Sequence, residues 1–126
     1  PNDVKTEILD AVEETSSFTG LTVVLAINYG GRDEIVRAVK SIIKDEDSIQ
    51  DVSEESIRDA FDVKELPDVD LLIRTGGELR LSNFLLWQLA YTELYFTSVY
   101  WPDFSKVDLL NAIYHFQNRK RRFGGV

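Results

Sequence analysis

Two short stretches of the chain are apolar almost without interruption and rich in branched aliphatic residues. They are residues 21–27 (LTVVLAI) and residues 69–74 (VDLLIR), and a pair of glycines follows each of them within three positions. Such a run, without regular polar alternation, is typical of a strand covered on both faces of a parallel sheet. A third run, residues 94–100 (LYFTSVY), predicts another strand, which Pro102 would end.

The segments between these runs carry apolar residues three or four positions apart, which predicts helices. Ser105 with Asp108 three positions on indicates a capping box at the start of the last helix, and Ser53 followed by two glutamates indicates a capped start for another. The helix expected at 83–93 is apolar nearly all round, so it should be buried. The predicted helices are residues 4–14, 32–45, a short one from Ser53, 83–93 and 106–122.

The predicted order is helix, strand, helix, helix, strand, helix, strand, helix. This alternation is typical of the α/β class, with a mostly parallel sheet flanked by helices, and 126 residues suit a single domain, residues 1–126. In open α/β sheets ligands bind beyond the carboxyl ends of the strands. The pairs Gly30-Gly31 and Gly76-Gly77 are therefore expected at one functional edge.

Composition narrows the class of protein. No apolar run approaches the roughly 18 residues of a membrane span, and the first residues have neither a basic start nor an apolar stretch, so a cytoplasmic protein is expected. Cysteine is absent, which excludes disulfides and thiolate chemistry. Methionine is also absent and the chain begins at Pro1, so we expect that a preceding segment is missing.

The charge is distributed unevenly. Residues 1–70 carry 18 acidic against 7 basic side chains, whereas residues 71–126 carry 4 against 7. The second part therefore suits an anion, but its one basic cluster, residues 119–122, is not interleaved with aromatic residues as a nucleic-acid surface would be. A small anionic ligand is the expected partner, and nucleic acid is not.

The stretch RTGGELRLS, residues 74–82, holds the candidate anion site. Arg74 closes a predicted strand, Arg80 lies six positions on, and Ser82 stands at the predicted start of the 83–93 helix. One guanidinium group can donate hydrogen bonds to two oxygens of the same phosphate, and helix N-termini attract anions. Simpler interpretations remain open, in which the glycines form only a turn, Arg74 only pairs with Glu78, and Ser82 only caps the helix.

Other side chains are ambiguous from spacing alone. Glu93 lies near the end of the apolar 83–93 helix, where a carboxylate needs either a metal ion or an arginine partner. His115 is the one histidine, and we assign it no catalytic role. The remaining aromatic side chains of this region are expected in the core: Trp87, Tyr91, Tyr95 and Phe96.

Four stretches, in this order, resemble the cis-prenyltransferase family, most nearly the bacterial undecaprenyl diphosphate synthases. They are NYGGRDEI (28–35), DLLIRTGGELRLSNFLLWQLAYTELYF (70–96), WPDF (101–104) and RRFGG (121–125). The likeness extends over residues 4–126 and corresponds to the C-terminal half of such enzymes. It implies transfer of isopentenyl diphosphate units onto an allylic (farnesyl) diphosphate with Mg²⁺, which yields a long cis-polyprenyl diphosphate used as a cell-wall lipid carrier.

The resemblance also assigns roles to single residues. Arg74, Arg80 and Ser82 would bind the diphosphate of isopentenyl diphosphate, and Glu93 would help to hold Mg²⁺. The family's C-terminal element, which reaches this site across a homodimer interface, is matched by Arg122 and Gly124. A position at the closed end of the product tunnel is matched by Leu21, and the sheet-edge motif by Asn28, Gly30, Gly31 and Arg32.

One family motif is missing from the chain. The aspartate-glycine-asparagine-glycine-arginine motif, whose aspartate is essential and lies in the N-terminal half of the family, does not occur here. We therefore expect the 126 residues alone to lack activity, and to associate or to be partly disordered in solution. Two alternatives remain, a non-catalytic accessory subunit of a heteromeric cis-prenyltransferase and a phosphate-binding α/β module with another chemistry.

Overall fold

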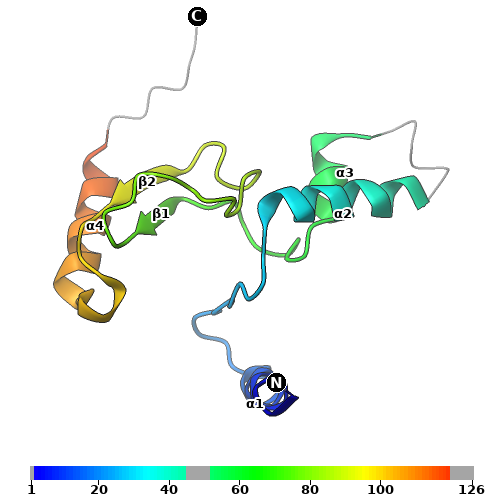
Figure 1. Cartoon of the computed structure of the whole chain (residues 1–126), viewed down its shortest axis with the longest axis horizontal. Helices are drawn as coiled ribbons and strands as arrows, with labels where there is room; N and C mark the ends of the chain where they lie inside the picture. The colour runs from blue at the N-terminus through cyan, green and yellow to red at the C-terminus, as the bar shows by residue number, and fades with distance from the viewer. Residues whose placement is uncertain (1, 45–51, 120–126) are drawn as a thin grey trace, which may run out of the picture.

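A computed structural model describes residues 2–44 and 52–119 of the chain. Four α-helices, a two-stranded sheet and one turn of 3-10 helix make up the regular structure of these residues (Figure 1). The elements in chain order are α1 (Asn2–Thr15), α2 (Gly31–Lys44), α3 (Glu54–Asp59), β1 (Leu71–Arg74), β2 (Glu93–Phe96), η2 (Trp101–Asp103) and α4 (Lys106–Asn118).

The sheet consists of β1 and β2, which run parallel. Leu71 pairs with Glu93 at the amino end of the strands, and Arg74 pairs with Phe96 at the carboxyl end. Helix α4 packs against β2, while α2 packs against α3 on the other side of the molecule (Figure 1). The expected class is confirmed in a partial form, because helices accompany a small parallel sheet.

Local capping signals define two of the helices. Ser53 accepts a hydrogen bond from the backbone N–H of Ser56 and begins α3, and Ser105 accepts one from the N–H of Asp108 and begins α4. In return the carboxylate of Asp108 accepts from the Ser105 N–H at 2.8 Å. The Ser105 hydroxyl, which donates to the Asp108 carboxylate at 2.6 Å, and next the Ser105 N–H hold the pKa of Asp108 below its usual range. The two predicted helix starts are confirmed.

The predicted strand at 21–27 is not a strand. The segment is extended, but no hydrogen-bonded ladder joins it to another described strand, and Leu21 and Val23 are 91% and 70% exposed. A strand forms only where a neighbour satisfies its backbone N–H and C=O groups. The described residues place no such neighbour beside this run, so its apolar pattern alone does not produce a strand.

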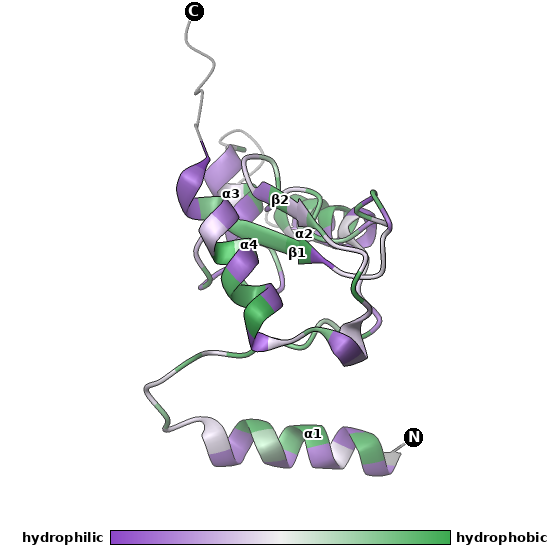
Figure 2. Ribbon diagram, turned by 90° about the vertical axis from the view of Figure 1, so that its left-hand side faces the viewer, coloured by the Kyte–Doolittle hydropathy of each residue, from purple (hydrophilic) through white to green (hydrophobic). Residues whose placement is uncertain are grey.

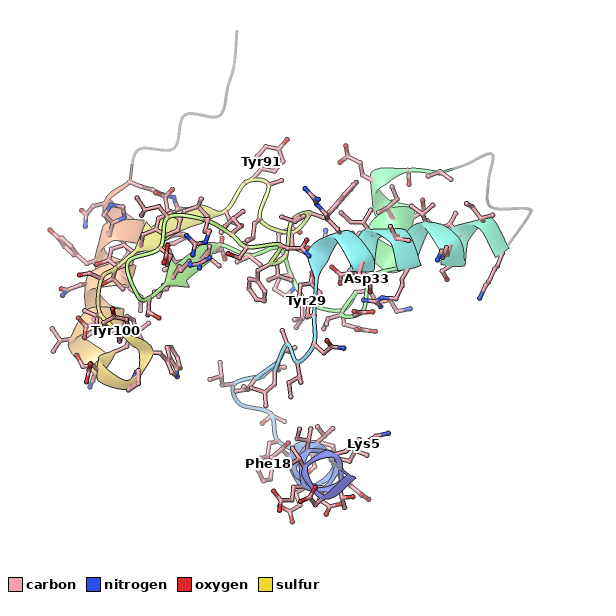
Figure 3. All side chains as sticks on the ribbon, viewed as in Figure 1. Lys5, Phe18, Tyr29, Asp33, Tyr91 and Tyr100 are labelled. Atoms are coloured by element: carbon pink, nitrogen blue, oxygen red, sulfur yellow. The ribbon has the colours of Figure 1, made fainter. Side chains whose placement is uncertain are left out.

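The predicted helix at 83–93 is also wrong. These residues form a series of turns, with positive φ at Asn83 (66°) and Leu85 (43°), and Glu93 begins β2 instead of ending a helix. An all-apolar helix depends on packing all round for its stability. Here the segment is only half covered, and Tyr91, which was expected in the core, is 93% exposed and points away from the ribbon (Figure 3).

The core of the described residues is correspondingly small. Its buried apolar side chains are Ala38, Phe61, Leu89 and Ala112. Phe61 packs edge-to-face against Trp87 with ring centroids 5.8 Å apart, which joins the residues that follow α3 to the 83–92 turns. Helix α1 lies apart from the other elements in both views, and most of its apolar residues, Val4, Leu9 and Val12 among them, remain exposed (Figures 1 and 2).

Arg122 and Gly124 lie outside the described residues, so their predicted roles stay predictions. Among the helices that the structure describes, none combines the length and the apolar character needed to cross a bilayer.

Candidate functional site

Arg74 and Ser82 meet at the carboxyl end of β1, as their proposed shared role requires. The Arg74 guanidinium donates a hydrogen bond to the Ser82 hydroxyl oxygen at 3.1 Å and a second one to the backbone carbonyl of Arg80. The loop between them therefore closes on itself through one arginine side chain. Ser82 has a φ of 49°, a left-handed backbone that serine seldom adopts.

The glycines of this loop provide its sharp turn. Gly76 and Gly77 have φ values of 85° and 78°, which a residue with a Cβ adopts only with strain. Their N–H groups donate to the carbonyls of Val99 and Thr97, both at 2.9 Å. These two donors already have partners, so the glycine N–H groups themselves do not serve an anion.

Glu78 pairs with the second arginine, not with Arg74 as the sequence allowed. Arg80 forms an ion pair with Glu78, and Arg74 is bonded to Ser82 and Arg80 instead of to Glu78. The side chains of Arg80 and Glu78 are 61% and 49% exposed. Ser82 caps no helix, because residues 82–91 are turns. The N-terminus of the helix expected at 83–93 therefore contributes nothing to this site.

The 28–32 loop contacts Asn83, the residue that follows Ser82. The backbone carbonyl of Asn83 accepts from the N–H of Gly31 at 2.7 Å, and its side-chain oxygen accepts from the N–H of Arg32 at 2.9 Å. Asn28, which was also singled out, has a left-handed backbone with a φ of 54°. The 28–32 loop is thus joined to the residue that follows Ser82, while the expectation that both glycine pairs lie at one sheet edge stays a prediction.

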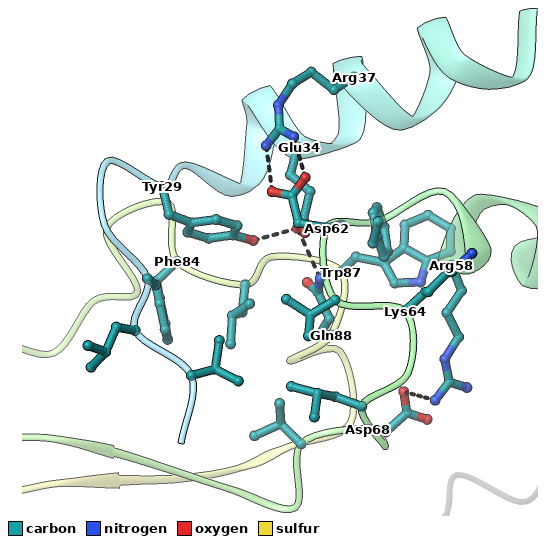
Figure 4. A pocket seen from close by; sticks show the side chains of 18 of the residues that line it. Tyr29, Glu34, Arg37, Arg58, Asp62, Lys64, Asp68, Phe84, Trp87 and Gln88 are labelled. Carbon is teal, nitrogen blue, oxygen red and sulfur yellow. Dashed lines mark hydrogen bonds and ion pairs between the residues drawn. The ribbon is translucent and has the colours of Figure 1, made fainter. Parts of the chain in front are cut away.

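A buried carboxylate that the sequence analysis did not select lies behind these loops. Glu34, in the first turn of α2, is 3% exposed. Its carboxylate accepts from the Tyr29 hydroxyl at 2.5 Å, from the Gln88 amide at 2.9 Å and from the Asp62 N–H at 3.4 Å (Figure 4). An acid in a first helical turn suits the helix dipole, so nothing in the sequence marked it as buried.

Arg37 fixes the neighbouring segment from the surface. Its guanidinium binds both carboxylate oxygens of Asp62 and donates to Asp33 at 2.8 Å (Figure 4). The hydrogen bonds from Arg37 hold the pKa of Asp62 below its usual range, and they raise the pKa of Arg37 itself. The start of α2 is thereby tied to the residues that follow α3.

A cavity of about 310 Å³ opens below this cluster (Figure 4). It lies between the extended segment 24–29, residues 61–69 and residues 84–88, and most of its lining side chains are apolar. Leu21, the residue matched to the closed end of a product tunnel, is not among its lining residues. The cavity therefore gives Leu21 no support as a tunnel residue.

Glu93 lies at the other end of the sheet from Arg74. Leu71, not Arg74, is its partner in the register, and three residues of strand span about 10 Å. Its carboxylate lies 3.5 Å from Nε of Arg119, whose guanidinium stacks on the ring of Phe116. Of the two interpretations of Glu93 in the sequence, the structure shows the ion pair with an arginine.

The metal interpretation has a limited fit. Within residues 2–44 and 52–119 no group of three or more acidic or histidine side chains gathers as a metal cage would. Mg²⁺ is commonly held by only one or two carboxylates together with substrate phosphates. Glu93, whose side chain is 30% exposed, fits the part of one such ligand.

Comparison with known proteins places this geometry in a family. Residues 1–124 match the prenyltransferase family model described as putative undecaprenyl diphosphate synthase. Curated isoprenyl transferases are similar over the whole chain: those of Bacillus thuringiensis subsp. konkukian, Listeria monocytogenes serotype 4b and Clostridium perfringens are 53%, 52% and 51% identical. The chain spans about half the length of each of these relatives, 50%, 52% and 51% respectively.

Solved structures agree with the sequence comparison. Lavandulyl diphosphate synthase from Lavandula x intermedia, in complex with dimethylallyl diphosphate, superimposes with a TM-score of 0.93 at 37% identity, over 99% of this chain and 56% of the other. A probable undecaprenyl diphosphate synthase from Campylobacter jejuni gives a TM-score of 0.84 at 40% identity, over 99% and 58%. This chain belongs to the prenyltransferase family described as putative undecaprenyl diphosphate synthase.

Proposed function

We propose that this chain forms the isopentenyl diphosphate-binding half of a cis-prenyltransferase. The complete enzyme would condense isopentenyl diphosphate onto an allylic diphosphate such as farnesyl diphosphate and release inorganic diphosphate. The observation that carries the proposal is the contact of the Arg74 guanidinium with the Ser82 hydroxyl at the end of β1. The isoprenyl transferase relatives and the neighbour that binds dimethylallyl diphosphate support the substrate class.

The loop's side chains would act by holding one diphosphate. Arg74 and Arg80 would supply fixed positive charge, and Ser82 would supply a hydroxyl donor. Both kinds of group bind phosphate oxygens. Arg80 would have to exchange Glu78 for the ligand, and because this ion pair is exposed, breaking it costs about 1 kcal/mol or less. Binding the diphosphate orients the attached double bond for attack on the allylic carbon.

Mg²⁺ is the cofactor that we propose for the complete enzyme. Glu93 would contribute one carboxylate, with the remaining ligands provided by diphosphate oxygens, water and residues beyond this chain. The ion would stabilise the negative charge that develops on the departing diphosphate. Arg119 occupies the Glu93 carboxylate in this structure, so this role requires Arg119 to share it or to move.

The finer features of the function rest on the family alone. A homodimer would bring Arg122 and Gly124 toward the diphosphate of the partner subunit, and Asn28 and Arg32 would line the same edge. Leu21 would limit the length of the product, for which we propose undecaprenyl diphosphate, a lipid carrier for cell-wall synthesis. A product so long and apolar would bring the enzyme to a membrane surface.

The first test uses a full-length isoprenyl transferase that contains this chain, which we call the full-length enzyme. Arg74→Ala should raise the KM for isopentenyl diphosphate about 10- to 100-fold, because a charge-assisted hydrogen bond contributes about 1.5–3 kcal/mol. Arg58→Ala is the matched control, since Arg58 pairs with Asp68 at 3.2 Å and not with the loop. An unchanged KM in Arg74→Ala, with the same thermal stability as the control, contradicts the proposal.

A second test addresses the chain on its own. The 126 residues, verified by intact mass, should give no polyprenyl product from labelled isopentenyl diphosphate, farnesyl diphosphate and Mg²⁺. Activity should appear only when the remainder of a family member is present, covalently or as a separate chain. Product from the isolated chain would show that these residues contain the complete catalytic machinery.

A further inference from the structure

The cluster around Glu34 is not explained by the proposed substrate contacts. Glu34 is the one charged side chain that is buried among the described residues. A carboxylate taken out of water is costly unless hydrogen bonds replace its hydration. Glu34 meets that condition with three donors, and each donor comes from a different segment of the chain. One carboxylate therefore joins three segments at a single point.

Two of those segments belong to the candidate site. Tyr29 lies in the 28–32 loop, and Gln88 lies in the turns that begin at Ser82. Burial, and next the hydrogen bond to Glu34, raises the pKa of Tyr29 well above its ordinary value, so the phenol remains a hydrogen-bond donor. The third donor, the Asp62 N–H, connects the same point to the residues that follow α3.

The junction between these two segments leaves little room for adjustment. A Cβ on Gly30 would lie 2.9 Å from the side-chain nitrogen of Asn83, and a Cβ on Gly31 would lie 3.0 Å from the backbone nitrogen of Leu86. Asn83 also accepts the N–H groups of Gly31 and Arg32. Asn83 follows Ser82 directly, so a shift of the 28–32 loop would move the hydroxyl that Arg74 contacts.

We propose that Glu34 is a positioning residue that holds the 28–32 loop against residues 82–88 and so places Ser82 for the diphosphate. The inference rests on the proposed function, and it adds a residue that would touch neither substrate nor metal. Its negative charge would repel a diphosphate at close range, but its oxygens point to Tyr29, Gln88 and the Asp62 N–H (Figure 4). Glu34 thus acts through its neighbours.

The test compares Glu34→Ala and Glu34→Gln in the full-length enzyme. Glu34→Ala should raise the KM for isopentenyl diphosphate tenfold or more while the KM for farnesyl diphosphate changes less than twofold. Glu34→Gln should stay within threefold of the parent enzyme. Its oxygen can still accept from both Tyr29 and Gln88, so that only the 3.4 Å contact with the Asp62 N–H is lost.

Asp33→Ala is the matched control. Asp33 is the preceding acid in the same helical turn, and its side chain is 73% exposed and paired with Arg37 (Figure 3). This variant should leave both KM values unchanged. A merely structural role for Glu34 would lower the folded fraction, and hence the apparent kcat, without separating the two KM values, and that result overturns the proposal.

Tyr29→Phe provides a second test of the positioning role if Glu34→Ala does not fold. It removes one hydroxyl from the cluster and should raise the KM for isopentenyl diphosphate about three- to tenfold, whereas an unchanged KM in this folded variant overturns the positioning role.

Arg74→Ala separates the positioning role of Glu34 from the proposed function. If Arg74→Ala raises this KM and the Glu34 and Tyr29 variants do not, only the positioning role fails. If Arg74→Ala has no effect, the proposed function itself fails.

Discussion

At Gly76 and Gly77 the backbone φ values are 85° and 78°, and a Cβ added there would meet no atom closer than 3.8 Å. At Gly30 and Gly31 the backbone stays outside the left-handed region, but an added Cβ would lie 2.9 and 3.0 Å from atoms of residues 83–86. The first pair needs glycine for its backbone conformation and the second pair needs it for space. Two identical dipeptides, each following an apolar run, thus meet different physical requirements.

The distinction is useful because the two requirements respond differently to substitution. Asparagine tolerates a left-handed backbone better than alanine does, but it occupies more volume. Where conformation matters, asparagine should be the milder replacement, and where space matters, alanine should be. The order of the two substitutions therefore identifies the requirement at each loop.

The largest effect is expected at Gly31. Gly31→Ala should lower the free energy of unfolding of the full-length enzyme by about 1–3 kcal/mol, because the new methyl group would press on the Leu86 backbone, which cannot move aside easily. Helix propensity alone would favour alanine by up to about 1 kcal/mol at this helical position. Urea unfolding gives the sign, and Gly31→Asn should be worse. A stabilised Gly31→Ala variant would show that the packing is looser than the structure indicates.

A smaller effect is expected at Gly77. Gly77→Ala should cost about 1–2 kcal/mol of the same free energy through backbone strain, and Gly77→Asn less than about 1 kcal/mol. The nearest atom to the added Cβ, the Cα of Ser98, lies at an ordinary contact distance of 3.8 Å. Equal losses for the two variants in urea unfolding would mean that backbone conformation does not limit this position.

The smallest effect concerns the ion pair beside the 28–32 loop. The hydrogen bonds from Arg37 lower the pKa of Asp62 in the folded state, so the pair stabilises the fold above the ordinary aspartate pKa of about 3.9 and stops doing so as the pH falls through the lowered value. Both side chains are more than 40% exposed. Asp62→Asn should therefore cost less than about 1 kcal/mol at pH 7.

The pH dependence of that cost provides its check. The difference in unfolding free energy between the parent enzyme and Asp62→Asn should be constant from pH 7 to about 5 and should shrink below about pH 4. Comparison of the two proteins cancels the titration of groups that they share. A difference that stays the same down to pH 3 would mean that the charge of Asp62 contributes nothing.

The parts of the fold that could be predicted from the sequence depend on local interactions. Ser53 and Ser105 satisfy helix N–H groups within three residues, so the starts of α3 and α4 follow from a few neighbouring positions. The runs at 21–27 and 83–93 depend on partners distant in sequence. Without those partners among the described residues, one run is extended but unpaired and the other forms turns.

The candidate site shows the same limit. Arg74 and Ser82 lie eight residues apart, and their types and spacing were sufficient to predict that they belong together. Glu34 and Gln88 lie 54 residues apart, and the contact between Asn83 and Arg32 spans 51. No short motif joins these residues, so the contacts between them could not be predicted from the sequence.

The engaged N–H groups of Gly76 and Gly77 bear on how ligand recognition would change under the proposed function. A ligand bound by main-chain amides is fixed by the path of the polypeptide, and single substitutions alter that path little. The amides of these two glycines already donate to Val99 and Thr97, so the binding that we propose would depend on the side chains of Arg74, Arg80 and Ser82. Under that proposal, substitutions at these three positions would alter the preferred anion and would leave in place the two hydrogen bonds that tie the loop to residues 97–99.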